Sequence, residues 1–237
     1  AIAMVVVWLI LLAPVLGGSP VSAGAARALF AALLGPWLLS PVLTLGGSFT
    51  PAYRAGHTWL MQWAILPVVG VFLALCIGAL VRAWRDGRIG RSTLLDARLS
   101  AFLVSAILTL LGFGLGAAIR GSTTMVPAHY HASVGAVTVA FMAATPGLLR
   151  ALGVFDSSPR LDRLAGLQPV LYGAGMALFA AGFALAGAHG MGRKVYGVEQ
   201  AARSLAESVG LVVMGVGGFV AAAGGVGLLF GQWAKAR

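Results

Sequence analysis

The chain has 237 residues, of which 59% are hydrophobic and 9% are charged, and its formal net charge is +10 at pH 7. Soluble globular domains carry about 25% charged residues, so this composition excludes a soluble domain, and the apolar content excludes a disordered chain. Long apolar blocks also argue against an outer-membrane barrel, whose strands alternate apolar and polar residues. The sequence therefore predicts an all-α polytopic membrane protein, with any chemistry inside the bilayer or at its faces.

Seven apolar blocks follow one another and are expected to form a single transmembrane domain over residues 1–237. Glycine, serine, proline or charged residues separate the blocks, as is typical of turns. Because each unsatisfied backbone group in lipid costs several kcal/mol, each block is predicted to be a helix. The blocks run over about 2–17, 28–48, 58–81, 99–119, 130–152, 167–188 and 208–231.

The N-terminal residues and the single cysteine also fit a membrane protein. The opening Ala1-Ile2-Ala3 has no initiator methionine and no basic segment, so it is not expected to be a signal peptide. Cys76 is the single cysteine and falls within a span, so no disulfide framework is expected.

Seven spans place alternate loops on opposite sides of the membrane. The positive-inside rule makes the side with more Lys and Arg residues cytoplasmic. We therefore expect a bacterial inner membrane protein whose N-terminus is periplasmic and whose C-terminus is cytoplasmic. The richer side holds eleven cations: Arg27, Arg82, Arg85, Arg88, Arg91, Arg98, Arg150, Arg160, Arg163, Lys235 and Arg237. The other side holds five: Arg54, Arg120, Arg193, Lys194 and Arg203.

All four histidines are predicted to lie towards the periplasmic face. His57 opens the third span, His129 and His131 open the fifth, and His189 follows the sixth. An ionisable side chain at membrane depth is costly, and is a functional-site hypothesis by default. For His189, beside an exposed loop, an ordinary interfacial role is favoured.

The sharpest feature is His129-Tyr130-His131 at the head of an apolar helix. Residues two apart on a helix point about 200° away from each other, so this pair does not suit one tetrahedral metal ion. The spacing does suit two planar cofactors, one on each side of the helix, and neutral imidazole is a common axial ligand of haem iron. The alternative is a pair of interfacial histidines that hydrogen-bond loop carbonyls.

Two segments resemble subunit I of the haem–copper oxidases. Residues 126–137, VPAHYHASVGAV, are similar to the family's tenth helix, which implies that His129 and His131 each ligate a haem. Residues 186–196, AGAHGMGRKVY, resemble the stretch after the eleventh helix, where two basic residues hold haem propionates. The resemblance gives that role to Arg193 and Lys194, as charge-assisted donors to carboxylates.

The resemblance extends over the family's eighth to twelfth helices, and departures from it limit the function. The segment from residue 56 to residue 69 is similar to the eighth helix, which makes His57 the implied opposite axial ligand for a haem on His129. The family's copper ion needs three histidines from the sixth and seventh helices, but the first two spans contain no histidine, and Ser40-Pro41 stands at the expected pair. No copper site is therefore expected.

The predicted function is a non-catalytic, haem-b-binding electron-transfer subunit of a respiratory oxidoreductase complex, with one haem b or two. Expected partners are other membrane subunits, lipid, and a periplasmic cytochrome, a dehydrogenase or quinone as electron partner, without nucleic acid. The alternatives are a cofactor-free membrane anchor derived from the oxidase fold and the C-terminal piece of a split or truncated oxidase. A transporter is less favoured, because the spans lack carboxylates and inverted repeats.

Overall fold

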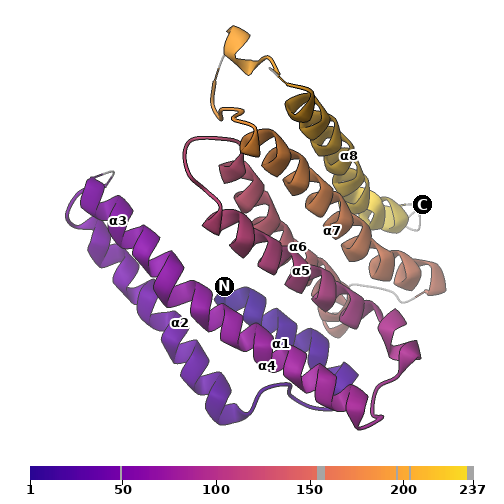
Figure 1. Ribbon diagram of the computed structural model, residues 1–237. Coiled ribbons are helices and arrows are strands. Elements are labelled where there is room, and N and C mark those ends of the chain that lie inside the picture. The colour runs from indigo at the N-terminus through magenta and orange to yellow at the C-terminus, as the bar shows by residue number, and fades with distance from the viewer. Residues whose placement is uncertain (49, 154–157, 196, 203, 234–237) are drawn as a thin grey trace. The chain divides into compact units, whose positions relative to one another are not determined.

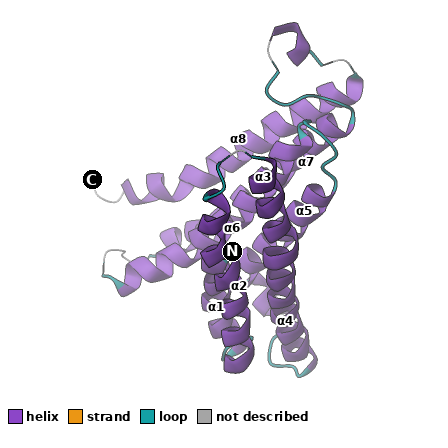
Figure 2. Ribbon diagram, turned by 90° about the vertical axis from the view of Figure 1, so that its left-hand side faces the viewer, coloured by secondary structure: helices purple, strands orange, loops and turns teal. Residues whose placement is uncertain are grey.

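The computed structural model describes residues 1–48, 50–153, 158–195, 197–202 and 204–233. This part of the chain is helical (Figures 1 and 2). Its one isolated β-bridge joins Thr123 to Gly192. Six of the described helices are long and apolar enough to cross a membrane, which confirms the all-α polytopic class. Four residues used in the sequence analysis lie outside the described ones: Tyr196, Arg203, Lys235 and Arg237.

The chain forms two compact units, residues 1–94 and residues 95–237. In the first unit α1 packs against α2 and α4, and Phe30 of α2 meets Phe72 of α4 edge to face. The first predicted span, α1, has 15 residues, fewer than the roughly 20 that a straight span needs, so it is not among the six candidate spans of the described residues. The helices of this unit are α1 (Ile2–Leu16), α2 (Ala23–Thr44), α3 (Pro51–Trp59) and α4 (Leu66–Arg85).

One helix runs without a break through α3 and α4, and Pro67 explains its irregular middle. A π-helical segment, Leu60–Ile65, joins α3 to α4. Pro67 has no backbone N–H, so the carbonyl of Trp63 loses its usual partner four residues later. Local π geometry is one way in which a membrane helix satisfies backbone groups freed by proline.

The second unit contains four long helices. In this unit α5 packs against α6 and α7, α6 against α7, and α7 against α8. A capping box opens α8, because the Ser204 hydroxyl accepts from the Glu207 N–H, and the Glu207 carboxylate accepts from the Ser204 N–H. The helices are α5 (Ala97–Ala117), α6 (Met125–Ala151), α7 (Pro159–Ala188) and α8 (Leu205–Trp233).

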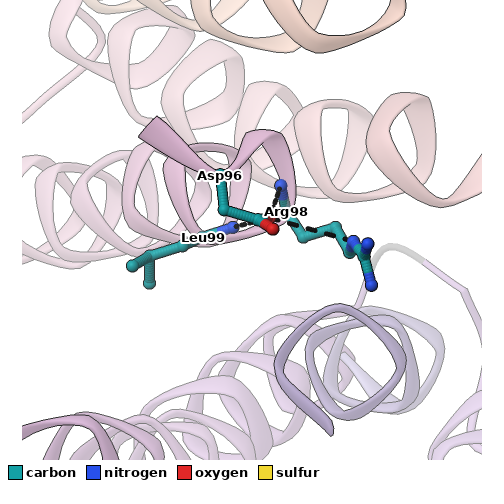
Figure 3. A network of polar contacts seen from close by, with 3 residues as sticks. All are labelled: Asp96, Arg98 and Leu99. Atoms are coloured by element: carbon teal, nitrogen blue, oxygen red, sulfur yellow. Dashed lines mark hydrogen bonds and ion pairs between the residues drawn. The ribbon is translucent and has the colours of Figure 1, made fainter. Parts of the chain in front are cut away.

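Asp96 defines the start of α5 (Figure 3). Its Oδ1 atom accepts the backbone N–H of Arg98 at 2.8 Å and that of Leu99 at 3.4 Å. The Arg98 guanidinium lies 3.8 Å from the same oxygen. The first N–H groups of a helix have no partner inside the helix, so this carboxylate satisfies two of them.

Replacing this cap tests its contribution. Asp96→Ala is expected to lower the free energy of unfolding by about 1 kcal/mol, the usual effect of losing an N-cap side chain. Asp96→Asn should retain most of the stability, because an asparagine oxygen caps almost as well. Thermal unfolding in detergent measures both, and equal losses in the two variants would contradict the capping role.

In the second unit, α7 and α8 lie side by side (Figure 1), and their backbones approach each other closely at glycines. A Cβ atom on Gly217 would lie 2.3 Å from the backbone nitrogen of Phe179, and one on Gly182 would lie 2.3 Å from that of Met214. Small residues allow the two backbones to approach this closely. In lipid, helices have no hydrophobic driving force for association, and the van der Waals packing of such close contacts stabilises the pair instead. Five glycines spaced at seven residues line the contact: Gly175 and Gly182 on α7, and Gly210, Gly217 and Gly224 on α8.

A matched pair of alanine substitutions tests this contact. Gly217→Ala should lower stability by about 1–3 kcal/mol, the typical effect of overpacking, because its new methyl group would meet the α7 backbone. Gly215→Ala on the same helix meets nothing within 4 Å and should leave stability unchanged or slightly raised. Unfolding in mixed micelles compares the two, and a neutral Gly217→Ala would show that α7 and α8 do not touch there.

Candidate functional site

The two segments that the sequence analysis singled out lie side by side in the second unit. The Thr124 N–H donates to the Met191 carbonyl at 2.9 Å, and the Arg193 N–H donates to the Ser122 carbonyl at 3.1 Å. The Thr124 hydroxyl also donates to the Phe183 carbonyl of α7 at 2.9 Å. These bonds hold the start of α6 against the end of α7, so His129, His131, Arg193 and Lys194 belong to one end of one bundle.

His129 faces α5. Its Nδ1 atom lies 2.7 Å from the carbonyl oxygen of Gly112. A carbonyl can only accept, so Nδ1 carries the proton, and Nε2 is left as the basic nitrogen without a hydrogen-bond partner in the described residues. Gly116 makes room for the ring, because a Cβ there would lie 2.9 Å from Nδ1.

His131 faces α7, on the other side of α6. Its ring stacks on Phe183 at 5.8 Å and meets the edge of Phe179 at 4.7 Å. This arrangement confirms that the two histidines point to opposite sides of the helix. Neither ring nitrogen of His131 hydrogen-bonds to another described residue, and no fully buried polar side-chain atom there lacks a partner. The His131 nitrogens are therefore reachable from the surface.

Arg193 and Lys194 border a cavity of about 530 Å³ at the same end of the bundle. The Arg193 Nε atom donates to the Ser122 hydroxyl at 3.2 Å. Lys194 has φ +56°, the left-handed region that few non-glycine residues adopt, and its exposed ammonium has no partner among the described residues. The lining residues are Thr124, Pro127, Tyr130, Phe183, Met191, Gly192, Arg193, Lys194, Val195 and Leu211.

The cavity belongs to the His131 side of α6. Phe183 both lines it and stacks on His131. Pro127, another lining residue, precedes His129 by two positions and so points about 200° away from it. Apolar walls with two cations at one edge suit a ligand that has an apolar body and anionic groups.

His57 lies in α3 of the first unit, and both of its ring nitrogens are engaged. Nδ1 donates to the Tyr53 carbonyl at 3.0 Å, and the Ser40 hydroxyl lies 3.2 Å from Nε2. The ring also lies 4.2 Å from that of Tyr53. His57 would bind a metal only after Nε2 gives up the serine hydroxyl.

His189 follows α7 and is exposed, and its Nδ1 atom donates to the Leu185 carbonyl at 2.9 Å. The described residues contain no group of three or more His, Cys, Asp or Glu that could hold a metal ion.

Several site residues were missed by sequence reasoning. Gly112 and Gly116 provide an acceptor and space for His129, and their four-residue spacing is a usable signal for close helix contact. Phe179, Phe183 and Ser122 carry no such signal, because their roles depend on how α7 and two loops meet.

No protein-family model, no curated protein and no solved structure matches this chain. The resemblance to haem–copper oxidases therefore depends on the residues quoted for it and stays a prediction.

A second pair of glycine substitutions tests the geometry of His129. Gly116→Ala should displace the imidazole from Gly112 and destabilise the protein by about 1–3 kcal/mol, because its methyl group would collide with Nδ1. Gly114→Ala meets nothing within 4 Å and serves as the control. Nitrogen-15 spectra of histidine-labelled protein should show a hydrogen-bonded Nδ1–H for His129 that is lost only in Gly116→Ala.

Proposed function

We propose that this chain is a haem-b-binding, non-catalytic electron-transfer subunit of a membrane oxidoreductase complex. One observation carries the proposal: His129 and His131, near the start of a membrane-spanning helix, keep ring nitrogens that no described residue hydrogen-bonds. An unpaired ionisable group at this depth is costly. Coordination of a haem iron would use those nitrogens. A bound haem b would supply a one-electron redox centre.

The surroundings of His129 suit a ligand role. Proteins commonly orient a ligating imidazole by a hydrogen bond from its other ring nitrogen to a carbonyl, which also fixes the tautomer. The bond from Nδ1 to Gly112 has this form, and it directs the basic lone pair to Nε2. Gly116 keeps the ring in place from the other side.

The surroundings of His131 suit a haem with its propionates at the loop end. The cavity beside the His131–Phe183 stack has apolar walls, and Arg193 and Lys194 stand at its edge. Two cations there would bind the two propionates through charge-assisted hydrogen bonds. The bond from Arg193 to Ser122 orients the guanidinium before any ligand arrives.

The oxidase resemblance implies that His57, in the first unit, is also a haem ligand. Its Nε2 atom would exchange the Ser40 hydroxyl for iron, and a neutral hydrogen bond of this kind contributes only about 1 kcal/mol net. For the His131 haem, a histidine of another chain or of a segment outside this sequence would complete the pair.

The distribution of cations supports an orientation in the bacterial inner membrane. Eleven of the sixteen Lys and Arg residues fall on one side, which we propose is cytoplasmic, together with the C-terminus. The histidines would then be periplasmic, and so would the N-terminus if α1 crosses the membrane as a seventh span. Electron exchange would occur with a periplasmic cytochrome, a dehydrogenase or quinone, within a complex of membrane subunits.

A cofactor-free scaffold is the second candidate. The observation in its favour is that both α6 histidines also fill space between helices, His129 against the glycines of α5 and His131 against two phenylalanines of α7. In this case the rings would contribute packing alone, and no haem would bind.

Haem content separates the two candidates. The pyridine haemochrome assay on the purified protein should show b-type haem. Because the two histidines face opposite sides of α6, His129→Ala and His131→Ala should each lower the haem-to-protein ratio if two haems are bound, and only one of the two substitutions should remove the haem if a single haem is bound. His189→Ala is the control, because that ring is exposed and bonded to its own helix. Circular dichroism should show unchanged helix content in all three variants.

Two results of the haem assay would contradict the proposal. A folded wild-type protein without haem, expressed in cells supplied with haem precursor, would reject the electron-transfer proposal and favour the scaffold. Haem that survives both α6 substitutions undiminished would show that the ligands lie elsewhere.

A further inference from the structure

The end of α4 forms a compact basic turn, far along the chain from the histidines of α6. Gly87 adopts φ +70°, the Gly87 N–H donates to the Trp84 carbonyl, and the Arg88 N–H donates to the Ala83 carbonyl. This pair of bonds is a Schellman motif, which ends a helix in a defined shape. Ile89 is buried and its N–H also donates to Ala83, so the turn is folded back onto α4.

The turn presents more positive charge than its own acid can neutralise. Residues 82–94 contain four arginines and one aspartate, a net charge of +3. Asp86 pairs with Arg88 at 3.2 Å. Arg82, Arg85 and Arg91 are exposed and have no ion-pair partner among the described residues.

Exposed apolar side chains lie among these arginines. Trp84 is 45% exposed and Leu94 is 47% exposed. Tryptophan is enriched where membrane helices meet the headgroup layer, and α4 is the last part of a candidate span. Cations beside exposed tryptophan and leucine form the pattern of a segment that lies in an anionic bilayer surface.

We propose that the α4 turn, residues 82–94, binds the phosphate groups of anionic phospholipids. Guanidinium groups bind phosphate in a bidentate manner, and Arg85, Arg88 and Arg91 lie on a turn whose backbone is already fixed. An acidic protein partner would use the same cations, but it would leave Trp84 and Leu94 at a charged interface. An anionic lipid surface accounts for both the exposed arginines and the exposed apolar side chains.

Native mass spectrometry of the full chain in detergent tests the proposal, with added phosphatidylglycerol or phosphatidylcholine as probe. The wild type should retain phosphatidylglycerol in preference to phosphatidylcholine. Arg85→Gln combined with Arg91→Gln should weaken that binding by roughly fivefold for each arginine removed. The control is Arg160→Gln with Arg163→Gln, which removes the same charge from exposed positions at the start of α7.

Three results would overturn the proposal: equal retention of the two lipids by the wild type, an equal loss in the control variant, or binding of a polyglutamate peptide that exceeds binding of phosphatidylglycerol. The last result would assign the turn to an acidic protein. Circular dichroism should show that both variants keep the wild-type helix content. Haem content is not involved, so this test is independent of the proposed electron-transfer function.

Discussion

The bilayer core holds no water, so polar groups of this chain must find partners within the protein. In the second unit, buried polar side chains donate hydrogen bonds to backbone carbonyls of neighbouring helices. The Ser105 hydroxyl donates to Ala136 at 2.8 Å, and the Gln168 amide donates to Gly225 at 2.9 Å. Such bonds require helices that lie close together, and glycine provides the closeness, most clearly between α7 and α8.

The candidate site follows from the same constraint. Glycines on α5 bring its backbone near enough for Gly112 to accept from His129, while the paired loops hold Arg193 beside the start of α6. The imidazole nitrogens of α6 that have no hydrogen-bond partner among the described residues are not buried, so a ligand could reach them. We propose that these nitrogens and the neighbouring cations bind the same kind of ligand, the nitrogens its iron and the cations its propionates.

Sequence reasoning reached the fold class and part of the site. Helical geometry alone predicted that His129 and His131 point apart, and they do, towards α5 and α7. The β-bridge that joins Thr123 to Gly192 was not predictable, because it depends on where two loops meet. The engagement of His57 by Ser40 was also missed, since a serine at the expected metal-ligand position gave no sign of which side chain it would bind.

The central claim is that histidine nitrogens of this chain bind haem iron. Pulsed electron paramagnetic resonance of the oxidised, purified protein, labelled with nitrogen-15 histidine, tests it most directly. The proposal predicts hyperfine coupling between the ferric iron and labelled nitrogen, and loss of the label's contribution when His129 and His131 are both replaced. An iron signal unaffected by the label, or a folded protein with no haem iron signal, would contradict the claim.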